Sequence, residues 1–169
     1  MHLEVFNWTN EAFTNWRKNT LLDKYSVLEI GSLDINGSIR SIFSDSSYYL
    51  GIDMQEGPGV DLVANASSFI VEEPVDIVVC CEVFEHTGEW PQIIEVTYKN
   101  LKKNGIFIGT AAGEGRKPHS AIDENPIRDW EYYSNVKAED LRGCLENSQF
   151  KNIVINNLNS DIRWTAIKI

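Results

Sequence analysis

One segment, residues 27–53, constrains the fold more than any other, and it reads VLEIGSLDINGSIRSIFSDSSYYLGID. An apolar run stops at a turn that begins with Gly31, a second glycine follows at Gly37, and another apolar run ends on Asp53. A strand, a glycine turn, a short helix and a second strand that ends on an acid form a βαβ unit of the nucleotide-binding kind. We therefore expect a mostly parallel sheet built outward from this unit.

The residues of this unit indicate what it could hold. Gly31 lets the backbone turn tightly and approach a ligand closely, while a helix beginning near Gly37 would direct its amide groups and positive dipole end toward an anion. Asp53 lies where an acid can accept hydrogen bonds from both hydroxyls of a ribose. The glycine spacing departs from G-x-G-x-x-G, because Leu33 and Asp34 stand where a second glycine is expected. This departure argues against a dinucleotide.

The composition restricts the kind of partner. The 169 residues match the size of one domain, so we expect a single domain over residues 1–169, with a leading helix within residues 1–24. The formal net charge of -10 disfavours a nucleic-acid partner, because affinity for phosphate backbones comes from Lys and Arg. The first residues lack the basic start of a secretion signal, and no run approaches about 18 apolar residues, so we expect a cytoplasmic protein without a membrane partner. Three cysteines, two of them adjacent at Cys80 and Cys81, predict reduced thiols.

Hydrophobic patterning predicts the remaining elements. The run DIVVCCEVFEH is the strongest buried-strand signal, since continuous apolar character suits a strand covered on both faces. Helices are expected at residues 9–22, capped by Asn7 or Thr9, and at 38–43, 91–104 and 138–145. Strands are expected at residues 25–30, 48–53, 60–63, 75–81, 105–110, 150–158 and 162–169. The last two would form an antiparallel hairpin, which gives a Rossmann-like three-layer α/β sandwich with a mostly parallel seven-stranded sheet.

Residues 111–136 carry no predicted helix or strand. A connection of that length inside a compact domain is usually functional, so we interpret it as a substrate loop or lid. Its aromatic residues Trp130, Tyr132 and Tyr133 either anchor the loop on the core or stack on a substrate.

Four ordered blocks carry a family resemblance: LEIGSLDINGS, YLGIDMQEGPGVDLVANA, DIVVCCEVFEH and LKKNGIFIGT. Together they resemble the class I S-adenosylmethionine-dependent methyltransferases, especially the small-molecule type with a Glu-His pair after the fourth strand. The resemblance spans roughly residues 25–110, and KPHSAIDENPIRDWEYY is similar to that type's loop of Pro-His followed by Asp and aromatics. It implies an enzyme that binds S-adenosylmethionine across the ends of its first, second and fourth strands and methylates a small-molecule or sugar-like acceptor.

This resemblance implies a set of cofactor contacts. Glu29 and Gly31 would lie beside the methionine moiety, Asp53 would bind the ribose hydroxyls, and Met54 would contact the adenine ring. Asn65 would hold the adenine amino group. The full implied set is Glu29, Gly31, Ser32, Gly37, Asp53, Met54, Asn65, Ala66, Cys81 and Glu82.

The sequence departs from the family at two places in this set. Asn65 stands where the family often has Asp, and its amide oxygen can still accept the adenine hydrogen bond. The first glycine loop is longer than the usual G-x-G-x-G and lacks its central glycine, so the course of residues 32–36 stays open. Ala66 would supply a backbone contact, while Cys81 and Glu82 would line the pocket floor.

Methyl transfer from a sulfonium needs mainly an in-line arrangement of donor and acceptor, and a base is needed only if the acceptor must lose a proton. His86 and His119 are the two candidate bases. Each also has a plainer interpretation, His86 as a packing or capping residue and His119 as a solvent-facing loop residue. With three His, no C-x-x-C and no H-x-x-x-H, the sequence predicts no metal site.

Two other functions stay open. A nicotinamide-dependent oxidoreductase would also use Asp53, although the missing G-x-G-x-x-G opposes it. A methyltransferase-like protein could instead hold the cofactor without catalysis, because the short chain leaves little room for a separate substrate domain. The family methylates O, N and C centres, so its resemblance does not choose among them, and the oligomeric state is not predicted. The Asn-Pro-Pro-Tyr motif of many amino-directed nucleic-acid methyltransferases is absent.

Overall fold

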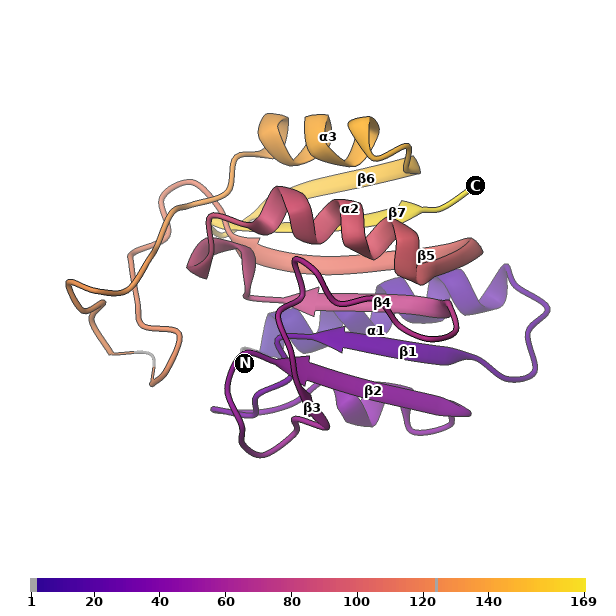
Figure 1. Cartoon of the computed structure of the whole chain (residues 1–169). Coiled ribbons are helices and arrows are strands. Elements are labelled where there is room, and N and C mark those ends of the chain that lie inside the picture. Colours follow the sequence, from indigo (N-terminus) through magenta and orange to yellow (C-terminus); the bar gives the residue numbers. More distant parts are fainter. Residues whose placement is uncertain (1–2, 124) are drawn as a thin grey trace.

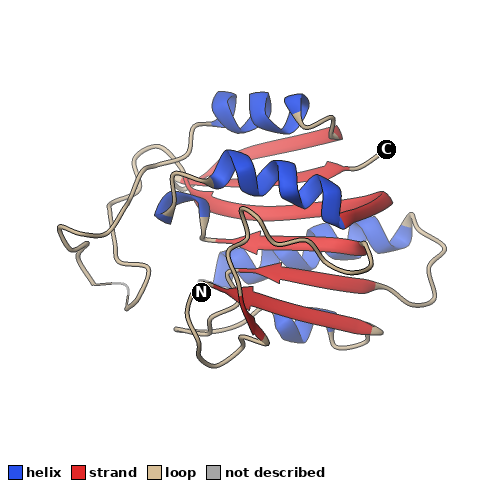
Figure 2. Ribbon diagram, in the orientation of Figure 1, coloured by secondary structure: helices blue, strands red, loops and turns tan. Residues whose placement is uncertain are grey.

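The computed structural model describes residues 3–123 and 125–169, which form a three-layer α/β sandwich (Figures 1 and 2). Within these residues one seven-stranded sheet has the order β3-β2-β1-β4-β5-β7-β6, which confirms the predicted fold class. Strands β1 to β7 are Ser26–Ile30, Tyr48–Asp53, Leu62–Val63, Val75–Cys81, Leu101–Ala112, Lys151–Leu158 and Asp161–Ile167. The helices are α1 (Leu3–Lys18), α2 (Trp90–Asn100) and α3 (Ala138–Asn147), with 3-10 turns η1 (Arg40–Phe43) and η2 (Phe84–His86).

The centre of the sheet fixes where a ligand can bind. β1 pairs in parallel with β2 on one side and with β4 on the other. The chain builds β2 and β3 outward from β1 and then crosses back to β4 and β5, so the strand order reverses between β1 and β4. In open α/β sheets, ligands bind beyond the carboxyl ends of the strands at such a reversal. Ile30, Asp53 and Cys81 end β1, β2 and β4 at this edge.

Helices cover both faces of the sheet (Figure 1), and each face carries its own hydrophobic core. α2 and α3 cover one face, around buried residues that include Phe84, Phe107 and Trp164. α1 covers the other face, where Phe13 and Phe43 pack edge to face with ring centroids 4.9 Å apart. The central strands are therefore covered on both sides, as their continuous apolar runs predicted.

The first helix starts earlier than its sequence pattern suggested. α1 begins at Leu3, so Asn7 and Thr9 lie inside it and the predicted caps are wrong. Val5 is fully buried, which shows that the apolar face extends upstream of the expected start. Thr9 is also buried, and its hydroxyl lies 3.6 Å from Cys81 Sγ, so α1 is anchored directly on the end of β4.

The helix expected at residues 38–43 is only the four-residue 3-10 turn η1. The expected helix terminus near Gly37 is therefore wrong, because a single short turn lacks the aligned amides that attract an anion. The serine-rich sequence around the turn favours local hydrogen bonds over a longer helix, as in the bond from the Arg40 amide to Ser38 Oγ at 3.1 Å. The Gly37 amide donates to Asp34 Oδ1 at 2.7 Å instead.

The second half of the sheet is antiparallel, as expected. β5 pairs with β7, and β7 pairs with β6. α2 ends at Asn100, about one turn before the predicted end, because Leu101 is extended and fully buried at the start of β5. Residues 113–137 contain no helix or strand among those described and project beyond the sheet edge (Figure 1). None of the described helices has the length and apolarity needed to cross a membrane.

Candidate functional site

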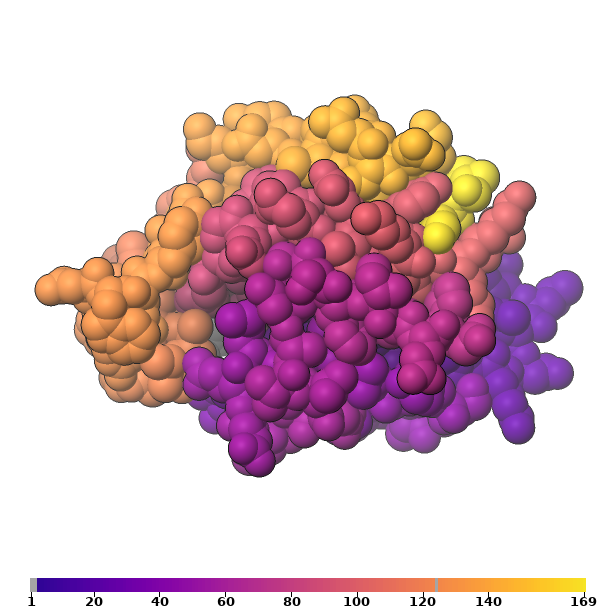
Figure 3. All heavy atoms as spheres, viewed as in Figure 1, coloured from indigo at the N-terminus to yellow at the C-terminus, as the bar shows by residue number. Residues whose placement is uncertain are grey.

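A cavity of about 580 Å³ opens at the carboxyl ends of β1, β2 and β4. This volume lies in the range of small-molecule sites. In Figure 3 it lies between the loop of residues 113–137, in orange, and the body of the sheet. All the predicted site residues line it: Glu29, Gly31, Ser32, Gly37, Asp53, Met54, Asn65, Ala66, Cys81, Glu82, His86 and His119. The contact that each makes with a ligand stays a prediction.

Gly31 makes the turn at the end of β1, where any residue with a Cβ would be strained. Its φ is 77°, in the left-handed region, and a Cβ at this position would lie 2.2 Å from Val83 Cγ2. The amides of Gly31 and Ser32 both donate to the carbonyl of Ile52, at 2.9 and 3.1 Å. The turn is therefore held against the end of β2.

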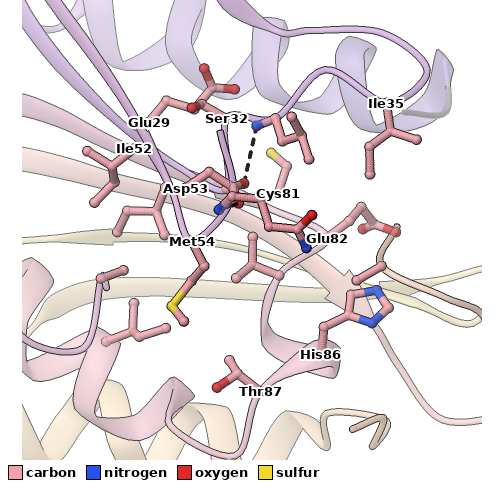
Figure 4. Close-up of a pocket in the computed structure, with 18 of the residues that line it drawn as sticks. Glu29, Ser32, Ile35, Ile52, Asp53, Met54, Cys81, Glu82, His86 and Thr87 are labelled. Atoms are coloured by element: carbon pink, nitrogen blue, oxygen red, sulfur yellow. Dashed lines mark hydrogen bonds between the residues drawn. The ribbon is translucent and has the colours of Figure 1, made fainter. Parts of the chain in front are cut away.

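The course of residues 32–36, which the sequence left open, is fixed by hydrogen bonds to the second strand and its loop. The Leu33 amide donates to Asp53 Oδ2 at 3.2 Å, and the Asp34 amide donates to the carbonyl of Pro58 at 2.8 Å. Asp53 Oδ1 also accepts the Gln55 amide at 3.0 Å. Two backbone amides thus orient the Asp53 carboxylate at the edge of the cavity (Figure 4).

Glu29 lies in the cavity wall and is 5% exposed. The Tyr49 hydroxyl donates to its Oε2 at 2.6 Å. Burial raises the pKa of the Glu29 carboxyl to about 7, although the Tyr49 hydrogen bond and the charge of Arg40 oppose the shift. Arg40 lies over the Tyr49 ring at 4.5 Å and forms an ion pair with Asp61. Tyr49, Arg40 and Asp61 therefore form a connected polar network next to the buried Glu29 side chain.

Cys81 and Glu82 line the cavity from the end of β4. Glu82 has a φ of 57°, which is uncommon for a residue other than glycine and often marks a functional position. Its amide donates to the Thr110 carbonyl at 2.9 Å, while the Thr110 hydroxyl donates to Glu82 Oε1 at 2.8 Å. Burial raises the pKa of the Cys81 thiol to about 12, so this sulfur is a neutral wall atom and not a nucleophile.

The expected adenine side of the cavity contains Met54, Asn65 and Ala66. Met54 is 67% exposed, and its thioether extends over the cavity (Figure 4). Asn65 Oδ1 accepts the Ser67 amide at 2.9 Å, and its Nδ2 donates to Glu89 Oε2 at 3.2 Å. The amide oxygen keeps one lone pair, so the predicted bond to an adenine amino group has an available acceptor.

Three aromatic rings meet beside the cavity, and two of them, His86 and His119, line it. His86 and His119 have ring centroids 5.1 Å apart, and Tyr133 lies 5.5 Å from His86 and 5.2 Å from His119. Burial, with the charge of His119, lowers the pKa of His86 to about 4, so its imidazole is neutral at pH 7. Tyr133 packs on both imidazoles and so anchors the loop of residues 113–137. Anchoring was one of the two interpretations of the loop's aromatic residues; the other was stacking on a substrate.

The charged side chains around this cavity are distributed unevenly. Among the described residues, four carboxylates line it and no Lys or Arg does; they belong to Glu29, Asp53, Glu82 and Glu89. The cavity therefore favours a cationic ligand over a phosphate-bearing one.

Sequence reasoning missed several residues of the wall, among them Leu33, Ile35, Glu89 and Ser120. Leu33 and Ile35 carried a usable signal, because large apolar residues in a polar turn often contact a ligand. Ser120 follows His119 directly and could have been included with it. Glu89 gave no signal, because only the fold brings it beside Asn65.

A scan against models of protein families found no match, and neither did a search of curated proteins. Solved structures do match. One match is a 1,6-didemethyltoxoflavin-N1-methyltransferase from Burkholderia thailandensis, whose structure contains 1,6-didemethyltoxoflavin and S-adenosylhomocysteine. The TM-score is 0.70 at 14% sequence identity, and the match covers 97% of this chain and 78% of that one. An S-adenosylmethionine-dependent methyltransferase from Clostridium acetobutylicum matches with a TM-score of 0.69 at 13% identity. The match covers 99% of this chain and 92% of that one. The fold is that of S-adenosylmethionine-dependent methyltransferases.

A third structure extends this likeness to a longer protein. The methyltransferase fold here also matches phosphoethanolamine N-methyltransferase 2 of Haemonchus contortus in complex with S-adenosyl-L-methionine, with a TM-score of 0.66 at 16% identity, over 95% of this chain and 52% of that one. The resemblance inferred from the four sequence blocks is confirmed for the fold. At these identities the likeness is one of backbone, so activity has to be argued from the residues of this chain.

Proposed function

We propose that this protein is an S-adenosylmethionine-dependent methyltransferase that acts on a small-molecule or sugar-like acceptor. The observation that carries the proposal is the acidic cavity at the strand reversal, with Asp53 at its edge. The cofactor carries a positive sulfonium and no phosphate, so carboxylates suit it. A nicotinamide dinucleotide brings two phosphates, and the described lining of this cavity offers them no Lys or Arg.

The geometry of Asp53 supports its predicted role toward the ribose. Each carboxylate oxygen accepts one backbone amide, from Leu33 or Gln55, and keeps lone-pair capacity for a hydroxyl. The side chain is therefore oriented before a ligand arrives, which reduces the entropy lost on binding. Met54 offers an exposed apolar surface beside it for a flat base.

When bound, the cofactor supplies an activated methyl group on its sulfonium sulfur. The work left to this chain is to hold the acceptor in line with that group and to exclude water. His86 and His119 line the cavity where the loop of residues 113–137 meets it, so we assign this part to the acceptor. A neutral His86 could accept a proton there if the acceptor must lose one.

Two of the matched structures support a small acceptor. The Burkholderia thailandensis enzyme holds 1,6-didemethyltoxoflavin, and a second Haemonchus contortus structure holds phosphomonomethylethanolamine. A small acceptor also agrees with the size of the cavity.

Calorimetric titration with S-adenosylmethionine, S-adenosylhomocysteine and NAD tests the cofactor. We expect the first two to bind and NAD not to bind. Asp53→Asn should weaken S-adenosylhomocysteine binding by about tenfold or more, because hydrogen bonds to a charged carboxylate contribute about 1.5–3 kcal/mol. Glu56→Gln, an exposed carboxylate outside the cavity lining, is the matched control. Tight NAD binding, or equal affinity in Asp53→Asn, would overturn this assignment.

Catalysis requires a separate measurement. Release of S-adenosylhomocysteine can be followed over a panel of small O-, N- and C-nucleophiles, including sugars. Turnover with one class would identify the acceptor. Tight cofactor binding without turnover on any class would instead favour a protein that holds the cofactor and does not catalyse methyl transfer.

A further inference from the structure

Three side chains with metal-binding atoms meet where the loop of residues 113–137 reaches the end of β4. Glu85 and His86 come from η2, and His119 comes from the loop. One ligand atom of each lies within 4.8 Å of the other two. The sequence predicted no metal site, because these residues come from two segments without a familiar spacing, and only the fold brings them together.

Glu85 provides the strongest sign that this cluster binds a cation. The residue is fully buried. Its Oε1 accepts the Ala112 amide at 3.1 Å, whereas its Oε2 is buried and has no hydrogen-bond partner. A buried carboxylate oxygen without a partner is costly, and a bound cation would satisfy it.

The two imidazoles have the arrangement expected of ligands to one ion. Their centroids lie 5.1 Å apart and their planes are inclined by 86°. Rings that bind through nitrogens at about 2.1 Å, with an angle near the tetrahedral value, have centroids about 5 Å apart. His119 Nδ1 lies 3.2 Å from the Lys117 carbonyl and can donate to it, which leaves Nε2 for the ion. Such a bond to a backbone carbonyl is the usual support of a metal-bound histidine.

The surrounding structure also holds the two segments together. The Ser134 amide donates to the backbone carbonyl of Glu85 at 2.8 Å, and Tyr133 packs against both histidine rings. The loop is therefore fixed beside η2 on two sides. Ligand atoms at about 2.0–2.2 Å from one tetrahedral ion lie about 3.5 Å apart, so binding would draw these side chains together from their separations of up to 4.8 Å.

We propose that Glu85, His86 and His119 bind a divalent first-row transition-metal ion such as Zn²⁺ or Mn²⁺. Two imidazoles and one carboxylate favour these ions over Mg²⁺ and Ca²⁺, which prefer all-oxygen ligands. Three protein ligands leave at least one coordination position open. Because His86 and His119 line the cavity, that position faces its interior. If the proposed methyltransferase function holds, the ion would bind an oxygen of the acceptor, and the two histidines would be ligands and not bases.

Metal binding can be tested on the full chain without any assay of methyl transfer. Protein stripped with a chelator is titrated calorimetrically with Zn²⁺, Mn²⁺ and Mg²⁺, and Co²⁺ is added as a spectroscopic probe. We expect one Zn²⁺ per chain, weaker Mg²⁺ binding, and a Co²⁺ spectrum without a thiolate charge-transfer band. Binding of Zn²⁺ should weaken at least tenfold in His119→Ala and in Glu85→Gln.

Control variants separate this site from other metal-binding groups. His2→Ala tests the remaining histidine, which lies outside the described residues, and Cys144→Ser tests a half-buried thiol. Neither should change Zn²⁺ affinity. Unchanged affinity in the His86→Ala, His119→Ala double variant, or no stoichiometric Zn²⁺ binding by the wild type, would overturn the proposal.

The same variants keep this proposal apart from the proposed function. S-adenosylhomocysteine binding by Glu85→Gln, a change outside the cavity lining, should stay close to that of the wild type, and it also reports that the variant is folded. Metal binding without any S-adenosylhomocysteine binding would reject the methyltransferase assignment and leave the metal site standing. Cofactor binding without metal binding would reject the metal site and leave the methyltransferase assignment standing.

Discussion

Gly31 is the residue on which the shape of the cavity depends most directly. Gly31→Ala places a Cβ 2.2 Å from Val83 Cγ2 on a backbone with a φ of 77°. The left-handed conformation costs about 1–2 kcal/mol for a residue with a Cβ, and overpacking costs about 1–3 kcal/mol. We expect the free energy of unfolding to fall by about 2–4 kcal/mol, as measured by urea denaturation.

Gly143→Ala is the matched control for this substitution. A Cβ at Gly143 meets nothing within 4 Å, and the residue lies inside α3. Alanine should therefore stabilise this helix by about 0.5–1 kcal/mol. Equal effects of the two alanines would show that Gly31 is an ordinary turn residue.

At this scale, sequence reasoning succeeded where a residue type is required by local backbone geometry or by a strand end. Gly31 and Asp53 were identifiable because a turn and an acid must follow buried strands in this unit. Glu85 was not identifiable as a candidate metal ligand, because its lack of a hydrogen-bond partner at Oε2 is a property of the packed structure. Glu89 was missed for the same reason, since it reaches Asn65 only in the fold.

Among the elements, α2 holds the segment that joins β3 to β4. Asn100, at the end of α2, is 1% exposed; its Oδ1 accepts the Val71 amide at 3.1 Å and its Nδ2 donates to the Phe69 carbonyl at 2.9 Å. Asn100→Ala leaves the buried Val71 amide and the partly buried Phe69 carbonyl without this partner, and a fully buried group without a partner costs about 1–3 kcal/mol. We expect the free energy of unfolding to fall by about 2–4 kcal/mol and hydrogen exchange at the Val71 amide to accelerate.

The exposed Asn147 at the end of α3 provides the comparison for this prediction. Asn147→Ala should change stability by less than about 0.5 kcal/mol. If Asn100→Ala has an equally small effect, water replaces its side chain and the segment is not held by α2.

The elements differ in how far their sequences determine them. Buried strands such as β4 were predictable, because continuous apolar runs suit a sheet covered on both faces. η1 was predicted as a helix because its apolar spacing is helical, yet local hydrogen bonds stop it after one turn. The start of α1 was placed too late, because Thr9 was interpreted as a cap although its hydroxyl packs against Cys81 across the layers.

Over the whole molecule, buried groups with opposite pKa shifts determine how stability depends on pH. Glu29 has its pKa raised from 4.5 to about 7, so between these values the folded state binds more protons than the unfolded state, and stability falls as pH rises. His86 has its pKa lowered from 6.5 to about 4, so there the unfolded state binds more protons and stability rises with pH. These two contributions have opposite signs, and burial also raises the pKa of Glu85 in the same direction as that of Glu29, so a substitution is needed to isolate one contribution.

Glu29→Gln isolates one of these contributions, since a Gln side-chain oxygen can still accept the Tyr49 hydroxyl. The stability of the wild type relative to Glu29→Gln should fall by about 2–3 kcal/mol between pH 5 and pH 8, because each pKa unit corresponds to about 1.4 kcal/mol. Urea denaturation of both proteins at several pH values measures this difference, and the exposed Glu56→Gln should follow the wild type throughout. Parallel curves for Glu29→Gln and the wild type would mean that Glu29 titrates near its ordinary pKa in the folded protein. The carboxylate would then be charged at neutral pH before any cationic ligand arrives, and the ligand would not need to shift its ionisation.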